Sequence, residues 1–297
     1  MHIGVLGNEG SWYVDQLCQA AGRRGHQTTE LRFPTQSPAL IDGATRLWFG
    51  DVDARQLDAI VVRTMPPGSL EQVVTRMNFL TVAREQGIVL LNSPKAIECA
   101  VDKYLTTQRL AAHGLPVPDT IVCESAEAAL DAFASLGGDV VIKPLFGAEG
   151  RGILRVDQEE LALRTFRTLE RLHAVIYVQR FIRGPAEDFR LLLLDGRLIG
   201  SMKRSAPAHD FRTNVAQAGQ ASAWQPSDRE RDLARQAAVA TGCLFCGVDL
   251  MYNAAGEPYI LEVNAVPGWR ALQKVSSVDV PEAVVCFLEQ QVAGGRS

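Results

Sequence analysis

The chain lacks long hydrophobic runs and any excess of positive charge. None of its apolar stretches approaches the roughly 18 residues that a membrane-spanning helix needs. Its first residues show neither the basic segment nor the long apolar segment of a secretory signal. The formal net charge is −4 at pH 7, so general affinity for nucleic acids or anionic membranes is not expected. These absences predict a cytoplasmic protein that binds neither nucleic acid nor membrane.

Histidine and cysteine are also scarce. The five histidines are scattered, and no Ser-His-Asp or Cys-His arrangement that would activate a side-chain nucleophile is recognisable. Cys243 and Cys246 form a single Cys-x-x-Cys pair without the second pair of a four-ligand zinc site. We expect reduced, buried thiols here, with redox or metal behaviour as the alternative. Gly4, Gly7 and Gly10 do not have the spacing of a nicotinamide-dinucleotide loop.

Short apolar strands alternate with helices in the first third of the chain. The pattern predicts strands at 3–7, 57–63 and 88–91 and helices at 12–24 and 69–86. This alternation is typical of a small parallel α/β domain. A single helix is then predicted from 94 to 113, because Ser93 and Pro94 form a helix start. Later helices are predicted at 125–136, 157–173, 227–242 and 281–291, and strands at 140–144, 153–156, 175–181, 189–194 and 198–203.

Residues 247–264 read as a β-hairpin around the turn-prone segment 253–256. Symmetric pairing places Asp249 opposite Glu262, and Asn264 shares the face of Glu262. Opposed carboxylates repel each other, so a cation is expected between them. Oxygen donors without histidine or cysteine suit Mg²⁺, with Mn²⁺ also possible. A solvated hairpin with scattered polar residues is the alternative.

A glycine-rich loop lies between two predicted strands at 143–152. It is not a Walker A loop, because no Gly-Lys-Ser/Thr precedes a helix. Its backbone N–H groups could instead lie along phosphate oxygens, which Lys143 would neutralise. An ordinary glycine-containing hairpin is the alternative. Further cations at Arg190, Lys203 and Arg204 lie on later strands, a layout that could hold a polyphosphate, its metal and an anionic substrate.

Together these motifs resemble those of RimK-like ATP-grasp carboxylate–amine ligases, the alpha-L-glutamate ligase family. The resemblance covers residues 92–270 and rests on the order of Asn92-Ser93, Asp102-Lys103, 116–118, 143–147, 179–182, 188–190, 210–214, 247–249 and 262–264. Two positions depart from the family pattern. Arg180 replaces a glutamate usual in the hinge, and Gln217 precedes only a single glycine.

The resemblance implies an α/β (α+β) fold in which two lobes clamp ATP. Residues 1–93 would form the N-terminal parallel α/β domain. Residues 94–175 would form the central lobe with the glycine-rich loop, and residues 176–297 the C-terminal lobe with the metal-binding hairpin. A homo-oligomer is also expected.

The resemblance further assigns roles to individual residues. Lys103 and Lys143 would contact the ATP phosphates. The loop with Gly147, Gly150 and Gly152 would cover those phosphates. Adenine would meet the segment Gln179, Arg180, Phe181 and Ile182. Either Glu187 or Asp188 would bind ribose. Two Mg²⁺ ions would be held by Asp249, Glu262 and Asn264. Phosphate or the acyl group would be bound by Arg212, with Arg190 and Arg204 as further candidates. The expected catalytic residues are Arg212, Arg190 and Lys143.

The implied reaction uses ATP to convert a carboxylate into an acyl phosphate, which an amine then attacks. The expected amine is an amino acid, L-glutamate, and the carboxylate belongs to a cofactor, peptide or protein. Two alternatives remain. One is an ATP-grasp kinase or nucleotide-binding regulatory protein that makes no amide. The other is a metal-dependent interaction module with a decayed site, which the intact lysine and metal-ligand set disfavours.

Overall fold

The computed structural model of the chain describes residues 1–147, 151–206 and 220–295. The predicted site residues Gly150 and Arg212 lie outside this part of the chain, as does Gln217. Within it, no helix is long and apolar enough to cross a membrane. The predicted mixed α/β fold class is confirmed by the arrangement that follows.

The N-terminal part is built around a parallel sheet with the strand order β2-β1-β6-β7. Its elements are β1 (His2–Leu6), α1 (Trp12–Arg23), β2 (Gln27–Leu31), β6 (Ala59–Val62), α2 (Leu70–Glu85) and β7 (Val89–Leu91). The strand β2 has no counterpart in the prediction. It is an edge strand of sequence QTTEL in which only Leu31 is buried, so it carries little hydrophobic pattern.

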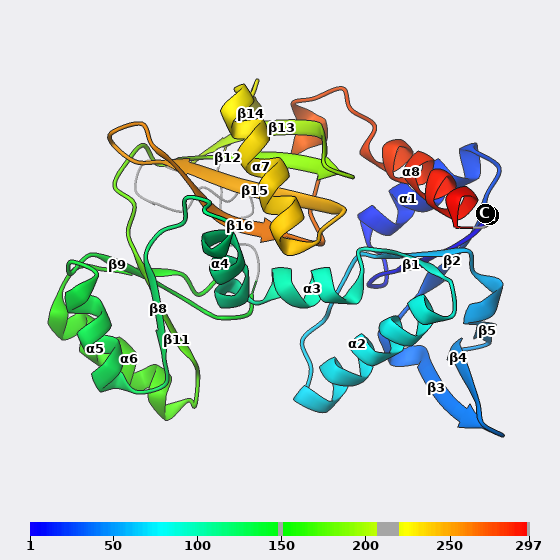
Figure 1. Cartoon of the computed structure of the whole chain (residues 1–297), viewed down its shortest axis with the longest axis horizontal. Helices are drawn as coiled ribbons and strands as arrows, with labels where there is room; N and C mark the ends of the chain where they lie inside the picture. The colour runs from blue at the N-terminus through cyan, green and yellow to red at the C-terminus, as the bar shows by residue number, and fades with distance from the viewer. Residues whose placement is uncertain (148–150, 207–219, 296–297) are drawn as a thin grey trace.

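A small antiparallel sheet projects from this part of the molecule (Figure 1). It consists of β3 (Gln36–Ile41), β4 (Ala44–Phe49) and β5 (Val52–Asp53). The sequence pattern predicted no strand in this region. Asp42 and Gly43 form the turn between β3 and β4, and both have positive φ angles. An Asp-Gly pair between strands is a strong hairpin signal, so the β3–β4 hairpin could have been predicted from the sequence.

The predicted helix from 94 to 113 is wrong in one respect, because the chain forms two helices there. These are α3 (Pro94–Val101) and α4 (Lys103–Ala112). Asp102 between them is extended, and its carboxylate accepts a hydrogen bond from the N–H of Leu105 at 2.9 Å. Asp102 is therefore the N-cap of α4, and Lys103 lies in the first turn of that helix.

The next lobe has an antiparallel sheet with the order β10-β9-β11-β8. Its elements are β8 (Thr120–Cys123), α5 (Ala126–Ser135), β9 (Val140–Lys143), β10 (Leu154–Val156), α6 (Glu159–Arg171) and β11 (Ile176–Arg180). Phe133 and Phe166 of the two helices pack with Ile142 and Val178 of the sheet in a core of their own.

The C-terminal part is an antiparallel five-stranded sheet with the order β14-β13-β12-β15-β16. Its elements are β12 (Glu187–Leu194), β13 (Arg197–Ser205), β14 (Gln220–Ala223), α7 (Asp228–Thr241), β15 (Phe245–Tyr252), β16 (Pro258–Asn264) and α8 (Val280–Gly294). Leu191 and Val248 on one face pack in a common core with alanines of α7. Leu192 and Phe245 on the other face share a core with α1 and α8.

The C-terminal sheet thus connects the two ends of the molecule (Figure 1). The α5–α6 lobe lies at one end, and α1 lies at the other with α8 packed beside it. Ion pairs at 2.6 and 2.7 Å join Arg24 after α1 to Glu282 and Glu289 of α8. The last helix therefore ties the end of the chain to the N-terminal sheet.

Candidate functional site

The hairpin of β15 and β16 places Asp249 opposite Glu262 and Gly247 opposite Asn264. The predicted juxtaposition is therefore present, but it depends on a β-bulge. Leu250 pairs with Ile260, so Leu261 is an extra residue in β16. Without this bulge Asp249 would face Leu261 and the carboxylates would lie on opposite faces.

A buried network of alternating charges surrounds Asp249. The guanidinium of Arg190 donates to its carboxylate at 2.7 and 2.5 Å. Arg204 contacts Asp249 at 2.9 Å and donates to Asp188 at 2.5 and 2.8 Å. Burial opposes ionisation of Asp249, but the charges of Arg190 and Arg204 outweigh it and lower the pKa of this carboxyl to about 2. Asp249 is therefore a carboxylate at every physiological pH.

The two candidate ribose ligands lie on opposite faces of β12. Asp188 is buried on the face of Asp249, where Arg204 binds it. The Glu187 side chain is one-third exposed and accepts a hydrogen bond from Lys203 at 3.0 Å. The sequence left the choice between them open, and both carboxylates have cationic partners here.

The two predicted phosphate-binding lysines lie on the central elements. Lys143 ends β9, and its Nζ donates to Gln179 Oε1 at 2.7 Å. Lys103 Nζ donates to the carbonyl oxygen of Gly147, at the start of the glycine-rich loop, at 2.9 Å. Both ammonium groups are within electrostatic range of Glu262. The structure therefore brings together these lysines, the loop and the hairpin.

The environment of these lysines favours their neutral forms. Burial lowers the pKa of Lys143 to about 8, and the charge of Lys103 acts in the same direction, whereas Glu262 opposes the shift. Burial also lowers the pKa of Lys103, against the charges of Glu262 and Asp102. An incoming polyanion would stabilise the protonated forms of both side chains.

Gln179 positions Lys143 through a hydrogen-bond network that sequence reasoning missed. Its Nε2 donates to Thr120 Oγ1 and to the Tyr177 hydroxyl oxygen, both at 3.0 Å. The Tyr177 and Thr107 hydroxyls are also 3.0 Å apart. Finding these supports requires the register that places Tyr177 opposite Lys143, which no local motif contains.

The predicted adenine segment consists of the end of β11 and the two residues that follow it. The N–H groups of Arg180 and Phe181 donate to the carbonyl oxygens of Asp119 and Asp139 at 2.9 and 3.0 Å. The Arg180 guanidinium forms an ion pair with Asp119 at 3.0 Å. The unusual arginine thus has a partner at the lobe surface. The next residue, Ile182, is half-buried.

Asn92 is a buried anchor whose structural role the sequence did not reveal. Its amide nitrogen donates to the carbonyl oxygens of Phe245 and Ala265, both at 2.6 Å. Its side-chain oxygen accepts from the N–H groups of Leu244 and Phe245, both at 2.8 Å. Asn92 therefore fastens the start of β15 and the residue after Asn264 to the N-terminal sheet.

The donor set of the hairpin fits a hard divalent cation. Among the described residues no group of three or more His, Cys, Asp and Glu is arranged to hold a metal. The candidate is therefore the carboxylate pair Asp249 and Glu262 with the amide of Asn264. Asn264 Nδ2 is buried without a hydrogen-bond partner in the described chain, so that nitrogen is not used to hold the fold. Mg²⁺ usually completes such a set with water and phosphate oxygens.

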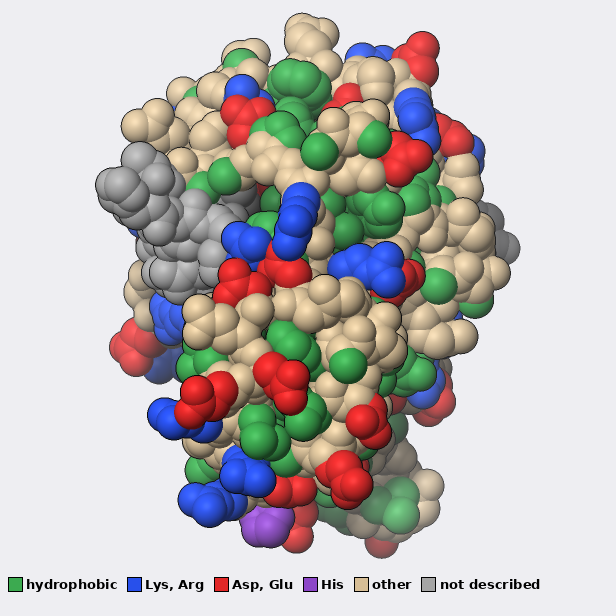
Figure 2. All heavy atoms as spheres, turned by 90° about the vertical axis from the view of Figure 1, so that its left-hand side faces the viewer, with side chains coloured by type: hydrophobic (Ala, Val, Ile, Leu, Met, Phe, Trp, Pro, Cys, Tyr) green, Lys and Arg blue, Asp and Glu red, His purple; other side chains and the backbone are tan. Residues whose placement is uncertain are grey.

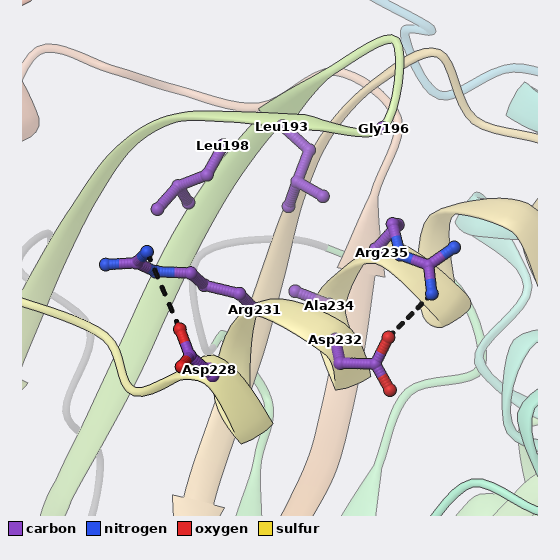
Figure 3. Close-up of a pocket in the computed structure, with 8 residues that line it drawn as sticks. All are labelled: Leu193, Gly196, Leu198, Asp228, Arg231, Asp232, Ala234 and Arg235. Carbon is purple, nitrogen blue, oxygen red and sulfur yellow. Dashed lines mark hydrogen bonds and ion pairs between the residues drawn. The ribbon is translucent and has the colours of Figure 1, made fainter.

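Figure 2 shows the end of the molecule formed by the α5–α6 lobe and the C-terminal sheet. Basic and acidic side chains lie beside one another in a band across the middle of this face. A separate pocket of about 340 Å³ lies between α7 and the β12–β13 turn (Figure 3). Its walls are Leu193, Leu198 and Ala234, and Arg231 and Arg235 at its rim pair with aspartates. None of the predicted site residues that the structure describes lines this pocket.

Cys243 and Cys246 are buried free thiols. Burial raises the pKa of Cys243 to about 11 and that of Cys246 well above its usual value. Raised pKa values keep thiols protonated and unreactive. The expectation of buried, reduced cysteines therefore agrees with the structure.

The fold is that of an ATP-grasp ligase. The structure of ATP-grasp ligase PsnB complexed with a minimal precursor has a TM-score of 0.75 at 22% identity and covers 97% of this chain and 98% of its own. The D-cycloserine synthetase DcsG has a TM-score of 0.74 at 20% identity and covers 98% of this chain and all of its own.

The sequence comparisons identify the family. The RimK-like ATP-grasp domain matches residues 100–288. The tetrahydromethanopterin:alpha-L-glutamate ligase of Methanosarcina acetivorans is 32% identical over 83% of this chain and 84% of its own. A probable alpha-L-glutamate ligase of Maridesulfovibrio salexigens is 28% identical over 100% of this chain and 98% of its own. The chain belongs to the RimK-like ATP-grasp family of carboxylate–amine ligases, which confirms the predicted family and enzyme class.

Proposed function

We propose that this enzyme uses ATP and Mg²⁺ to join L-glutamate through its amino group to the carboxylate of an acceptor. The observation that carries the proposal is that Lys103, which holds the start of the glycine-rich loop, and Lys143 both lie within electrostatic range of Glu262 of the hairpin. Cations and carboxylates at such a spacing can hold a nucleotide and its metal. One solved neighbour of this fold, PsnB, has been determined with Mg and ADP.

We propose that two Mg²⁺ ions bind at the hairpin. Their ligands would be Asp249, Glu262 and Asn264. When bound, Mg²⁺ neutralises phosphate charge and thereby lowers the repulsion between ATP and an incoming carboxylate. Arg190 and Arg204 keep Asp249 ionised and oriented. Lys143, held by Gln179, and Lys103 would donate to phosphate oxygens.

The reaction needs no side-chain nucleophile. A carboxylate oxygen of the acceptor forms a bond to the γ-phosphorus of ATP, and ADP leaves with the electron pair of the broken bond. The amine of glutamate, after losing its proton, then attacks the carbonyl carbon. Phosphate leaves as the amide forms. The enzyme contributes positioning and charge stabilisation, which suits a site built from lysines, arginines and carboxylates.

The acceptor is proposed to be a small cofactor or a peptide with a free carboxylate. Two matched relatives are named for the addition of glutamate to tetrahydromethanopterin, which supports a cofactor acceptor. The PsnB complexes contain precursor peptides, which supports a peptide as the other class of acceptor. A cytoplasmic location and a homo-oligomeric state remain predictions from the sequence.

A phosphate-release assay with paired substrates tests the proposal. ATP, Mg²⁺ and L-glutamate are combined with candidate carboxylate acceptors, and the products are analysed by mass spectrometry. We expect phosphate release that requires both the acceptor and glutamate, with a product heavier by one glutamyl residue. Phosphorylated acceptor that accumulates without any effect of added amino acids would instead identify a kinase.

A further inference from the structure

The N-terminal sheet has a reversal point between β1 and β6. The connection from β1 through α1 leads to β2 on one side, and the connection from β6 through α2 leads to β7 on the other. Ligands of parallel sheets bind outside the carboxyl ends of strands at such a point. Arg63 directly follows β6, and its N–H donates to the carbonyl oxygen of Leu6 at 2.7 Å. It therefore stands at the carboxyl ends of both strands.

Among the residues that the structure describes, the buried Arg63 guanidinium has no acidic partner. The residue is only 9% exposed, and Nη2 donates to the carbonyl oxygen of Pro267 at 2.7 Å. Its carbon Cζ lies 4.5 Å from the ring centre of Trp269 and 5.2 Å from that of Tyr13. Nε and Nη1 have no hydrogen-bond partner in the described chain. Arg190 and Arg204 differ, because each is paired with a carboxylate.

Other buried donors without partners lie in the same region. Trp269 Nε1 and Asn264 Nδ2 also lack partners among the described residues, and both belong to the segment that includes and follows the end of β16. The helix α1 begins nearby, since its Tyr13 packs on Trp269, and the side chain of its N-cap Ser11 makes no capping hydrogen bond. The N-terminal N–H groups of a helix favour anions. These groups are all donors, and an anion would complement them.

We propose that Arg63 binds a carboxylate of the amino-acid substrate, a group that is not itself activated during the reaction. The inference rests on the proposed ligase function, and it extends that function to a binding site. The acid that becomes activated must lie at the metal and the phosphates. The carboxylates of glutamate need a cation outside that centre, where they cannot compete for the phosphoryl group.

The surroundings of Arg63 fit this role. It contacts Pro267, three residues beyond Asn264, so the two sites share one segment of chain. Because the rings of Tyr13 and Trp269 cover the guanidinium, a bound carboxylate must displace part of that cover. Binding of glutamate should therefore alter the fluorescence of Trp269.

The experiment compares Arg63→Met, Arg63→Lys and the matched control Arg76→Met. Arg76 is likewise buried, 8% exposed, donates to one backbone carbonyl of Pro66 at 2.7 Å and lies over the ring of Phe33. Calorimetry measures L-glutamate binding to the enzyme loaded with Mg²⁺ and a non-hydrolysable ATP analogue. Phosphate release in the presence of an acceptor that supports turnover gives the KM for glutamate and for ATP, and thermal unfolding reports stability.

We expect Arg63→Met to raise the Kd and KM for glutamate by about 10–100-fold, the value of a lost charge-assisted hydrogen bond. The KM for ATP should remain within about twofold on the same reasoning, and Arg63→Lys should recover part of the affinity. Glutamate should change the tryptophan emission of the wild type but not of Trp269→Phe. Arg76→Met should lower stability without altering glutamate affinity.

Unchanged glutamate affinity in Arg63→Met, or equal effects of Arg63→Met and Arg76→Met, would overturn the inference while leaving the ligase function intact. A failure of the proposed function itself would give a different result, which is seen with the wild-type enzyme. If wild-type enzyme does not bind glutamate, and glutamate has no effect on phosphate release with any of the candidate acceptors, the proposed amino acid is wrong and the carboxylate assignment falls with it.

Discussion

The protonation of Lys143 should control how nucleotide binding depends on pH. Its pKa is lowered from 10.5 to about 8, first by burial and then by the charge of Lys103. Only the protonated ammonium can donate to a phosphate oxygen as a cation. A bound polyphosphate stabilises this form, so the lysine should take up a proton on binding wherever it is neutral in the free enzyme.

The size of the effect follows from this linkage. Below pH 8 the free side chain is already charged, and affinity should be nearly constant. Above pH 8 each further unit should weaken nucleotide binding by up to about tenfold, until the higher pKa of the complex is reached. The phosphate groups change little here, because their second pKa is about 6.

The assay is calorimetry with Mg²⁺ and ADP from pH 7 to 9.5, repeated in two buffers to count protons. At pH 9 Lys143 should account for close to one proton taken up per nucleotide, which is the difference in uptake between wild type and Lys143→Met, and the variant should bind weakly with a flatter profile. Lys103 contributes as well, since its pKa is lowered by burial, so Lys103→Met provides the second variant. A flat wild-type profile without proton uptake would refute this account of Lys143.

The free energy of unfolding should also depend on the protonation of Lys143, and the lowered pKa fixes the sign of this pH dependence. Between the lowered pKa of about 8 and the ordinary value of 10.5, Lys143 binds its proton in the unfolded chain but not in the folded one, so the contribution of this lysine to stability should rise with pH in that window. Urea unfolding of wild type and Lys143→Met at pH 7.5 and 9.5 checks this, because the variant should lack the increment.

Two further predictions concern the supports of the site. Arg204→Met leaves Asp188 buried without its main partner and should cost about 3–5 kcal/mol in urea unfolding; Arg24→Met, which breaks exposed ion pairs, should cost much less, and equal losses would contradict the assigned burial. Asn92→Ala leaves backbone groups at the base of the hairpin unpaired and should cost about 1–3 kcal/mol per unsatisfied group. It should also raise the Mg²⁺ concentration needed for half-maximal nucleotide binding, and an unchanged Mg²⁺ requirement would show that Asn92 does not position the hairpin.

Local patterns were sufficient for most helices and for the hairpin. The predicted helix at 227–242, for example, begins with a capping box of Ser227 and Glu230, a signal that lies within one turn of the chain. The facing of Asp249 and Glu262 was predicted from symmetric pairing, yet it is produced by the bulge at Leu261. The correct outcome thus had a different physical cause.

Other features depend on contacts between distant parts of the chain. Asp102 looked like an interior helix residue, although its capping of α4 sets the position of Lys103. The pairing of Arg204 with both Asp188 and Asp249 follows from the strand order β13-β12-β15, and Asn92 contacts residues about 150 positions away. A sequence pattern cannot reveal such partners, because nothing local fixes them.

The central claim is that the hairpin oxygens hold the magnesium that presents ATP to a carboxylate. The most direct test measures nucleotide binding and phosphate release against Mg²⁺ concentration for wild type and Glu262→Gln. The account predicts that Glu262→Gln needs much more Mg²⁺ and loses about 10²–10³-fold in rate, with its unfolding free energy nearly unchanged. A variant with the wild-type Mg²⁺ dependence and full turnover would contradict it.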